Sequence, residues 1–486
     1  RAILFTPQGR PVSSAAFPFA QHYPNPGWVE HDPEDLLSTS VRALRGAVEQ
    51  AGVPPESIAA MGITNQRETT LRWEREGGRA VCPAVVWQCR RTAPIIQRLR
   101  EDGLAPMVTQ RTGLVPDAYF SASKITWLLD EAGLRGRAEA GELRFGTVDS
   151  FLVSQLVEGA PHVTDATNAS RTMLFSLKDQ RWDPDLLAAF RVPEALLPEV
   201  RDTSGYVGML KKDILGAEIP VTALAGDQHA ALFGQGCYAP GGVKNTYGTG
   251  CFMLMNTGDA PVQATGGLLS TMAWRIGGKA VFALEGSVFT AGAAIQWLRD
   301  GLGIISSAAE TEALAAQVAD TGGVHFVPAF TGLGAPHWDM YARGTFTGLT
   351  RGTDRRHLCR AALEAIAFQS DDLLRLMESV SGMPPRALRA DGGATENALL
   401  MQAQADISGI RVIRPLVRES TALGAARLAG LAVGFPVGED TACDTAREGD
   451  TAFEPNITDE QRAAMRAGWA RAVDAALHWA KDAAGR

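Results

Sequence analysis

Apolar positions near the start of the chain follow first the strand period and then the helix period. Two short runs, residues 2–6 and 12–19, flank a Gln8-Gly9 turn and predict a β-hairpin. A helix is predicted from Pro33, because Asp32 can cap its first turn and Gly52 can end it. Its apolar face recurs every three or four residues, at Leu37, Val41, Leu44 and Val48.

Three later apolar runs each end abruptly in a polar or glycine-rich tip. Residues 58–64 run into Asn65–Thr69, residues 220–225 into Gly226–Gln228, and residues 388–390 into Asp391–Ala394. Strands that alternate with helices indicate an α/β fold. Ligands bind beyond the carboxyl ends of strands in such sheets, so these tips are candidate binding segments.

The remaining pattern predicts further strands and helices of the same kind. Strands are expected at 243–256, with a bend at Gly248-Thr249-Gly250, and at 280–284 and 324–328; helices are expected at 289–298, at 358–377, and from a capping box of Thr458 and Gln461. We place a boundary near residues 234–242, which divides the chain into an N-terminal domain, 1–234, and a C-terminal domain, 235–486.

Composition narrows the class of protein. A chain of 486 residues fits two domains of ordinary size, and 45% hydrophobic with 21% charged residues is a globular composition. The formal net charge of −8, with both signs interspersed, argues against a nucleic-acid-binding surface.

Sequence features of secretion, membrane insertion and metal clusters are missing. The six cysteines form no C-x-x-C pair, which argues against a zinc or redox motif and suits a reducing compartment. The chain shows no apolar run of 18 residues and no signal-peptide core at its start. A cytoplasmic protein without stable membrane insertion is therefore expected.

Arg67-Glu68 is the first candidate for chemistry. A fixed cation beside a fixed anion can bind neighbouring hydroxyls, each of which both donates and accepts. Trp87 could pack on the C–H face of a polyol. The alternatives are a surface ion pair of little energetic value and an ordinary core tryptophan.

Asp227-Gln228 is the second candidate. A carboxylate at a strand end could orient an attacking hydroxyl and accept its proton. Alternatively, Asp227 caps the helix that follows. His229 next to it fits a hydrogen-bonded structural histidine better than a catalytic one.

The glycine loops are the third candidate. Gly248-Thr249-Gly250 and Asp391-Gly392-Gly393 can expose backbone N–H groups to phosphate oxygens, although each loop alone is usually a turn. The sequence has no G-x-x-x-x-G-K-[ST] loop, so the protein is not a Walker-type ATPase. It also has no G-x-G-x-x-G fingerprint, which argues against a dinucleotide-binding protein.

Several segments in this order resemble the FGGY family of carbohydrate kinases, and its glycerol branch more than its sugar kinases. They are 26–32, 65–70, 86–92, 165–173, 226–228, 244–253 and 328–351. The resemblance runs almost end to end. It implies an actin-like (ribonuclease H-like) fold of two α/β domains flanking a deep cleft, and a cytoplasmic transferase that phosphorylates glycerol to sn-glycerol 3-phosphate.

The resemblance also implies site residues and cofactors. Asp227 would be the catalytic base and would also hold Mg²⁺. The substrate would be bound by Arg67, Glu68, Trp87, Tyr119, Asp227, Gln228 and Phe252. ATP would be bound by Arg1, Thr249, Gly292, Gln296, Gly393 and Asn397. A homodimer or homotetramer is expected.

One departure from the family concerns the start of the chain. The family opens with an inner strand and a phosphate-binding loop, and Arg1 resembles the arginine just after that loop. The first inner strand is therefore expected to be missing, and a polypeptide beginning at Arg1 is expected to have little kinase activity. A substrate-binding but inactive form stays open, as do a kinase of another small polyol or ketose and a nucleotide-switched binding protein of the actin-like group.

Overall fold

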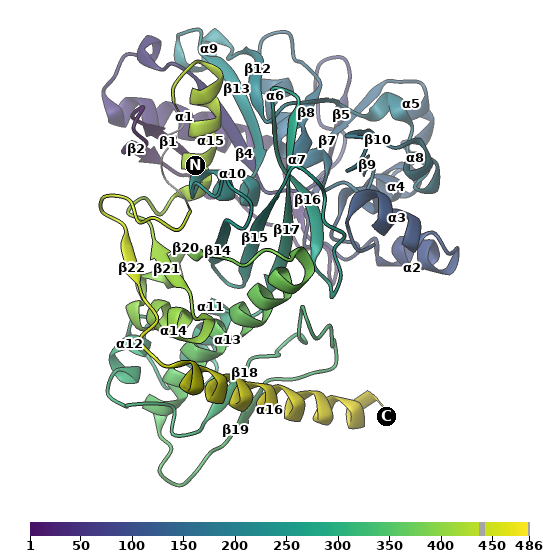
Figure 1. The fold of residues 1–486 in the computed structure, drawn as a ribbon. Coiled ribbons are helices and arrows are strands. Elements are labelled where there is room, and N and C mark those ends of the chain that lie inside the picture. The colour runs from purple at the N-terminus through teal and green to yellow at the C-terminus, as the bar shows by residue number, and fades with distance from the viewer. Residues whose placement is uncertain (437–442, 485–486) are drawn as a thin grey trace.

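The structure, a computed structural model, describes residues 1–436 and 443–484. A ten-stranded mixed sheet runs through it in the order β22-β21-β20-β14-β15-β17-β16-β12-β13-β4 (Figure 1). Its strands are β4 (Met61–Asn65), β12 (Ser204–Met209), β13 (Pro220–Gly226), β14 (Val243–Tyr247), β15 (Cys251–Gly258), β16 (Leu269–Ile276), β17 (Lys279–Val288), β20 (Ala387–Asp391), β21 (Arg411–Arg414) and β22 (Thr451–Phe453).

The other strands in the described ranges form two-stranded sheets. These pairs are β1 (Ala2–Phe5) with β2 (Pro11–Ala15), β3 (Glu30–His31) with β6 (Ala84–Val85), β5 (Leu71–Glu74) with β7 (Leu143–Gly146), β8 (Val163–Asp165) with β11 (Glu199–Arg201), β9 (Phe175–Ser176) with β10 (Arg181–Trp182), and β18 (His325–Val327) with β19 (Thr345–Thr347).

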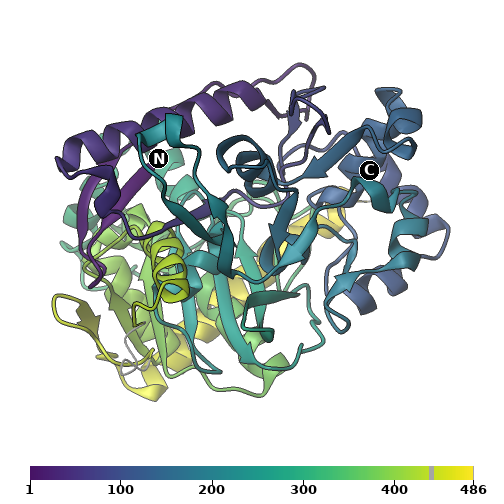
Figure 2. The ribbon, with the colours of Figure 1, turned by 90° about the horizontal axis from the view of Figure 1, so that it is seen from above.

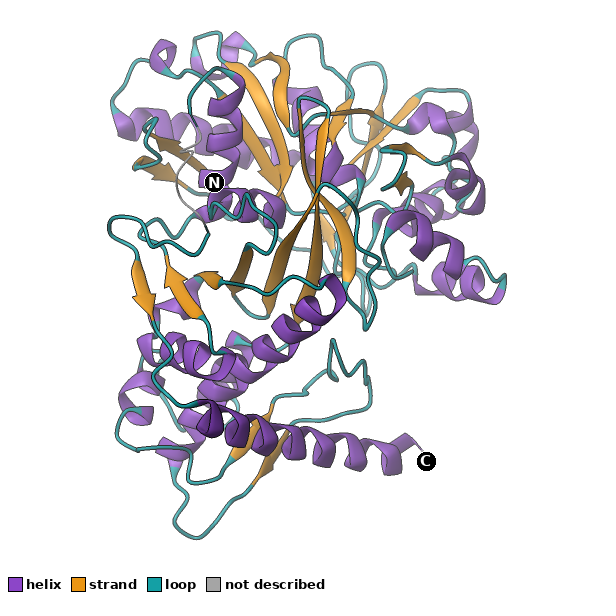
Figure 3. Ribbon diagram, viewed as in Figure 1, coloured by secondary structure: helices purple, strands orange, loops and turns teal. Residues whose placement is uncertain are grey.

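Helices surround the large sheet, as the secondary-structure colouring of Figure 3 shows. They are α1 (Pro33–Ala51), α2 (Ala93–Glu101), α3 (Ala105–Thr112), α4 (Ser121–Glu131), α5 (Arg135–Glu139), α6 (Val148–Leu156), α7 (Ala166–Ala169), α8 (Pro184–Ala189), α9 (Lys212–Leu215), α10 (Asp227–Gly234), α11 (Gly292–Asp300), α12 (Glu310–Ala315), α13 (Arg355–Ser381), α14 (Ala398–Ser408), α15 (Ser420–Ala432) and α16 (Asp459–Ala484), with short 3₁₀ turns η1 (Pro55–Ser57), η2 (Glu194–Leu196) and η3 (Gly393–Glu396).

Parallel pairing brings the predicted polar tips to strand ends. β4 and β13 run parallel with Asn65 opposite Gly226, and β14 and β20 run parallel with Thr246 opposite Asp391. The segments that follow β4 and β13 therefore start side by side, and so do those that follow β14 and β20. This is the arrangement in which open α/β sheets bind ligands.

Helices α10 and α15 cross at backbone contact. A Cβ atom on Gly424 would lie 1.8 Å from the carbonyl oxygen of Ala230, and one on Gly234 would lie 2.1 Å from that of Ser420. Only glycine fits at such a crossing. α10 carries Asp227 at its first position, so this crossing helps to place the candidate base.

The predicted N-terminal elements are present, with one shorter than expected. Asp32 caps α1 by accepting from the amide of Glu34 at 2.9 Å, and Gly52 ends the helix with a φ of 64°. The second hairpin strand ends at Ala15 rather than at residue 19. Ala15 pairs with Ala2, the first residue of β1, so the ladder between the two strands ends there.

Two predicted boundaries around β17 are wrong for one reason. The strand was expected to end at residue 284, but β17 continues to Val288 because it pairs with β15 on one side and with β16 on the other. The next helix consequently begins at Gly292 rather than at residue 289. The capping box of the last helix is confirmed: Thr458 and Gln461 exchange hydrogen bonds of 2.9 and 3.3 Å.

A groove separates the hairpin β1–β2 from β4. Within the described ranges β4 pairs with β13 alone, and the hairpin forms its own sheet. The groove has a volume of about 430 Å³ and is bordered by β1, β4 and α15. Figure 2 shows the hairpin beside α1. Among the described helices none is long and apolar enough to cross a bilayer.

Candidate active site

Arg67 and Glu68 lie at the tip of β4, where they are almost completely buried. Their side chains are 2% and 1% exposed, so the alternative of a surface ion pair is wrong. Glu68 has a φ of 62°, a left-handed conformation that is uncommon outside glycine. Such backbone strain, worth about 1–3 kcal/mol, is retained where surrounding contacts hold the residue in place.

The contacts that hold it form a charge cluster of four buried residues: Arg67, Glu68, Arg171 and Glu285. Arg67 donates through both terminal nitrogens to the carboxylate of Glu285, at 2.5 and 2.9 Å. Arg171 bridges the two acids, at 2.7 Å to Glu68 and 3.1 Å to Glu285. Arg67 and Glu68 are 3.8 Å apart, so the main partner of each lies elsewhere in the chain.

The two carboxylates of the charge cluster face the same two arginines but differ in acidity. Glu285 accepts hydrogen bonds from both Arg67 and Arg171, whereas Glu68 accepts from Arg171 and lies 3.8 Å from Arg67. Burial raises the pKa of Glu68, against the opposing charges of Arg67 and Arg171. Burial also acts on Glu285, but there the guanidinium groups of Arg171 and Arg67 prevail and hold its pKa far below the ordinary value. Glu285 is therefore the firmly ionised acid of the cluster.

Asp227 extends the charge cluster toward solvent. One of its carboxylate oxygens lies 3.2 Å from Nε of Arg67, and its side chain is 35% exposed, against 2% for Arg67. The alternative role as a helix cap is not what the structure shows: Gly226 is the N-cap of α10, and Asp227 accepts from the amide of the adjacent Gln228 at 2.7 Å. An anion that a substrate can reach thus sits against a buried cation.

The tips of β4 and β13 are tied together by small polar side chains. The side-chain amides of Asn65 and Asn168 exchange hydrogen bonds of 3.0 and 3.1 Å. The amide of Gly226 donates to the hydroxyl of Thr167 at 2.9 Å. A Cβ atom on Gly226 would come within 2.7 Å of the Arg67 side chain, so glycine is needed for the two tips to meet.

Aromatic rings flank the charged groups. Trp87 and Tyr119 meet edge to face with ring centres 5.4 Å apart, and Arg171 lies 5.9 Å from the Tyr119 ring centre. Lys124 is buried beneath this wall and donates to the carbonyl oxygens of Tyr119 and Phe120 at 2.8 and 3.3 Å. Burial lowers the pKa of Lys124 to about 7.

Gln228 and Phe252 join the same neighbourhood through one lysine. The Gln228 amide lies beside Asp227, with Nε2 3.3 Å from the carboxylate. Lys244 contacts both the Gln228 side chain and, at 3.2 Å, the carbonyl oxygen of Phe252. A series of contacts through Arg171 and Lys244 thus links the seven residues predicted to bind the substrate, Phe252 by its backbone carbonyl and Trp87 by the Tyr119 ring.

The two loops predicted to bind phosphate lie at the ends of β14 and β20, which are adjacent parallel strands. The turn at Thr249 lies against the start of α11, and a Cβ atom on Gly292 would meet the carbonyl oxygen of Gly248 at 2.6 Å. Gly392 has a φ of 92°, and a Cβ atom there would lie 2.4 Å from the carbonyl oxygen of Tyr247. The glycines are thus required by close backbone approach as well as by the conformation.

The other predicted nucleotide-site residues lie around these loops. Gln296 is exposed on α11 and Gly393 is exposed at the start of η3. Asn397 caps α14: its side-chain oxygen accepts a 2.9 Å hydrogen bond from the backbone amide of Leu400. Arg1 pairs with Glu419, and the neighbouring Ser420 hydrogen-bonds Asp391, so Arg1 lies on the same side as the glycine loop.

Sequence reasoning missed two members of the charge cluster. Arg171 lies in the segment 165–173 but was given no role, and Glu285 was not considered because the predicted strand stopped one residue before it. The sequence signal for Glu285 was a charged side chain directly after the apolar run of the predicted strand. His229 is buried and lies 3.2 Å from the hydroxyl of Thr271, which agrees with the structural role predicted for it.

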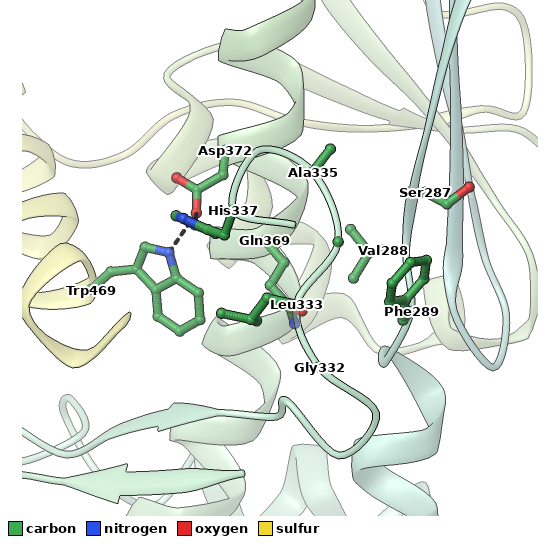
Figure 4. A pocket seen from close by; sticks show the side chains of 11 residues that line it. Ser287, Val288, Phe289, Gly332, Leu333, Ala335, His337, Gln369, Asp372 and Trp469 are labelled. Atoms are coloured by element: carbon green, nitrogen blue, oxygen red, sulfur yellow. Dashed lines mark hydrogen bonds and ion pairs between the residues drawn. The ribbon is translucent and has the colours of Figure 1, made fainter. Parts of the chain in front are cut away.

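A second hollow, drawn in Figure 4, is too small to be a ligand site. It lies where the loop at Gly332 and His337 meets α13 and α16, and Trp469 donates to Asp372 there at 2.7 Å. Its volume of about 10 Å³ has room for roughly one water molecule. It is therefore too small to hold a substrate or a nucleotide.

Comparison with known proteins places the chain among kinases. The model of the FGGY family of carbohydrate kinases, N-terminal domain, matches residues 1–234, and that of the C-terminal domain matches residues 243–433. Together they cover most of the chain.

Individual relatives match over nearly the whole length. The chain is 54% identical to glycerol kinase 2 of Thermotoga maritima over 482 residues, covering 99% of this chain and 97% of that protein. It is 56% identical to a glycerol kinase of Aromatoleum aromaticum over 480 residues, with the same coverage.

A solved structure extends the likeness to the fold. The crystal structure of Plasmodium falciparum glycerol kinase with ADP superimposes with a TM-score of 0.88 at 33% identity, covering 95% of this chain and 92% of that one. The predicted two-domain actin-like fold is thereby confirmed. The chain belongs to the FGGY family of carbohydrate kinases.

Proposed function

We propose that this enzyme transfers the terminal phosphoryl group of ATP to glycerol and forms sn-glycerol 3-phosphate. The observation that carries the proposal is the partly exposed carboxylate of Asp227, 3.2 Å from the buried guanidinium of Arg67. Support comes from the likeness to glycerol kinases along the whole chain. This likeness to glycerol kinases does not favour the alternative of a kinase that acts on another polyol or on a ketose.

Glycerol would be held by its three hydroxyl groups. Arg67 offers donors, Glu68 offers an acceptor, and the Tyr119 hydroxyl can do either. The rings of Trp87 and Phe252 would cover the carbon backbone, which has only C–H bonds to present. This arrangement fits a small triol, because each hydroxyl would contact a polar side chain and the carbon atoms would contact the aromatic rings.

Asp227 would act on the hydroxyl that attacks phosphorus. It would accept that hydroxyl's proton as the oxygen–phosphorus bond forms, while the bond to the ADP leaving group breaks on the opposite side. The Arg67 guanidinium, 3.2 Å away, would hold this carboxylate in position beside the substrate. Positioning and charge stabilisation would provide most of the rate, as in phosphoryl transfer generally.

The loops at the ends of β14 and β20 would hold the nucleotide. Thr249 and Gly393 would present backbone N–H groups to it. The N–H of Gly292 already donates to the carbonyl oxygen of Gly248 at 3.0 Å, so Gly292 would border the site, together with Gln296, Asn397 and Arg1. A solved relative contains ADP.

Magnesium would be held by Asp227 together with the phosphates. The described residues contain no group of three or more acidic, histidine or cysteine side chains that could hold a metal ion. One partly exposed carboxylate nevertheless suits Mg²⁺, which is commonly bound by one or two carboxylates plus substrate phosphates. The bound ion would neutralise charge on the phosphates.

A coupled ADP-release assay tests the proposal. With ATP and Mg²⁺ present, we expect kcat/KM for glycerol to exceed that for erythritol and for xylulose by about tenfold or more. Phosphorus NMR and a stereospecific dehydrogenase should identify the product as sn-glycerol 3-phosphate. A higher kcat/KM for xylulose or erythritol would contradict the choice of substrate.

A binding measurement separates failure of catalysis from failure of recognition. If glycerol raises the melting temperature without any ADP release, the protein recognises glycerol but does not turn it over. If glycerol changes neither quantity, the proposed function is wrong.

We also infer a cytoplasmic location and a dimeric or tetrameric assembly. Six free cysteines in a long chain support a reducing compartment. Light scattering after size exclusion gives the assembly state directly.

A further inference from the structure

Lys244 is a fully buried cation that no step above uses. It lies in β14, and its exposed fraction is 0%. Its ammonium group donates to the side-chain oxygen of Gln228, to the hydroxyl of Thr246 at 3.0 Å and to the carbonyl oxygen of Phe252 at 3.2 Å. Three acceptors match the three N–H donors of a charged lysine, whereas a neutral amine has only two.

The three acceptors belong to different parts of the candidate site. Gln228 lies in the first turn of α10, next to Asp227. Thr246 and Phe252 face each other across the β14–β15 hairpin, whose turn carries Thr249. Lys244 thus joins the substrate side of the site to the hairpin predicted to contact the nucleotide.

The contact with Gln228 also fixes which end of its amide faces Asp227. A glutamine amide can usually turn over, exchanging its oxygen and nitrogen. Here the oxygen is occupied by the Lys244 ammonium, so Nε2 remains as the end that lies 3.3 Å from the Asp227 carboxylate. A reversed amide would place its oxygen against that carboxylate and its N–H groups against the ammonium, and both contacts would be repulsive.

We propose that Lys244 is a positioning residue that holds the Gln228 amide with its N–H end toward the substrate. This rests on the proposed function and deepens it. A hydroxyl between Gln228 and Asp227 must then accept from Nε2 and donate its own hydrogen to the carboxylate. Lys244 therefore sets the direction in which the attacking alcohol gives up its proton, without touching the alcohol.

A double-mutant cycle on glycerol kinetics tests this role. The variants are Lys244→Met, Gln228→Ala and the pair, with Lys178→Met, an exposed lysine in a turn, as the control. We expect Lys244→Met to lower kcat/KM for glycerol by about 10- to 100-fold, as loss of a charged hydrogen bond does, with the KM for ATP changed less than about threefold. Because Lys244 acts through Gln228, the double variant should be little worse than Gln228→Ala alone.

Measurements of folding and of glycerol binding distinguish a loss of positioning from a loss of structure. Circular dichroism and melting curves show whether Lys244→Met is folded; if it is not, Lys244→Gln replaces it, with the same outcomes expected. Calorimetric titration with glycerol should show weakened binding for the Lys244 variants relative to wild type and Lys178→Met. Full additivity in the cycle, or unchanged kinetics for glycerol, would overturn the proposal.

The proposed function can fail separately. A wild-type protein that phosphorylates another alcohol in a Lys244-dependent, Gln228-coupled way would refute glycerol as the substrate and leave the role of Lys244 standing. A wild-type protein that neither binds nor phosphorylates any alcohol would overturn both.

Discussion

Replacement of Asp227 by asparagine is expected to lower kcat for glycerol phosphorylation by about 100- to 10,000-fold, the range that general base catalysis contributes. The amide has nearly the shape of the carboxylate but accepts no proton from the attacking hydroxyl. Glycerol affinity should change by less than about tenfold, because Arg67, Glu68 and the aromatic wall are untouched. Coupled ADP release and calorimetry with glycerol measure the two effects separately.

Asp102→Asn provides a matched control for that variant. Asp102 is an exposed carboxylate at the end of α2, so the same chemical change there should leave kcat unaltered. A kcat for Asp227→Asn within tenfold of wild type would show that another group accepts the proton. Equal losses in kcat and in glycerol affinity, with a lowered melting temperature, would instead indicate a structural role.

Replacement of Glu285 by glutamine is expected to reduce the free energy of unfolding by about 3–5 kcal/mol, the usual cost of breaking a buried ion pair. Glu285 is 1% exposed and receives hydrogen bonds from both Arg67 and Arg171. Without its charge, Glu68 is the buried carboxylate that remains beside the two arginines, and Asp227 contacts Arg67 from the solvent side. Urea denaturation at neutral pH measures the loss, with the exposed Glu218→Gln as control.

The pH dependence of stability should change in the same variant. The pKa of Glu285 is lower in the folded protein than in the unfolded chain, where it is about 4.3. As the pH falls below that value, the unfolded chain takes up a proton first, and the stabilisation from Glu285 is lost. Wild type should therefore lose more stability than Glu285→Gln in this acidic range. A loss below about 1 kcal/mol at neutral pH and parallel acid profiles would contradict the account.

Local signals in the sequence were sufficient for several elements. Asp32, Pro33 and Gly52 mark α1 correctly because capping and turn preferences depend on neighbours in the chain. The tips after β4 and β13 were also found, since an apolar run that stops at polar residues is visible locally. The pairing of Asn65 with Gly226 then follows from parallel strands.

Long-range partners were not predictable in this way. The ion pair expected between Arg67 and Glu68 is in fact a charge cluster completed by Arg171 and Glu285, which lie more than a hundred positions away. The position of Lys244 beside Gln228 likewise depends on how β14 meets α10. Such contacts are set by tertiary packing, and periodicity within one segment carries no information about them.

The location of glycerol in a ternary complex tests the central claim most directly. In a crystal structure with glycerol and a non-hydrolysable ATP analogue, a primary hydroxyl should lie within about 3.2 Å of the Asp227 carboxylate. The other hydroxyls should contact Arg67 and Glu68. The terminal phosphate of the ATP analogue should lie next to the attacking oxygen, on the side away from Asp227. Glycerol bound elsewhere, or Asp227 turned away from it, would contradict the account.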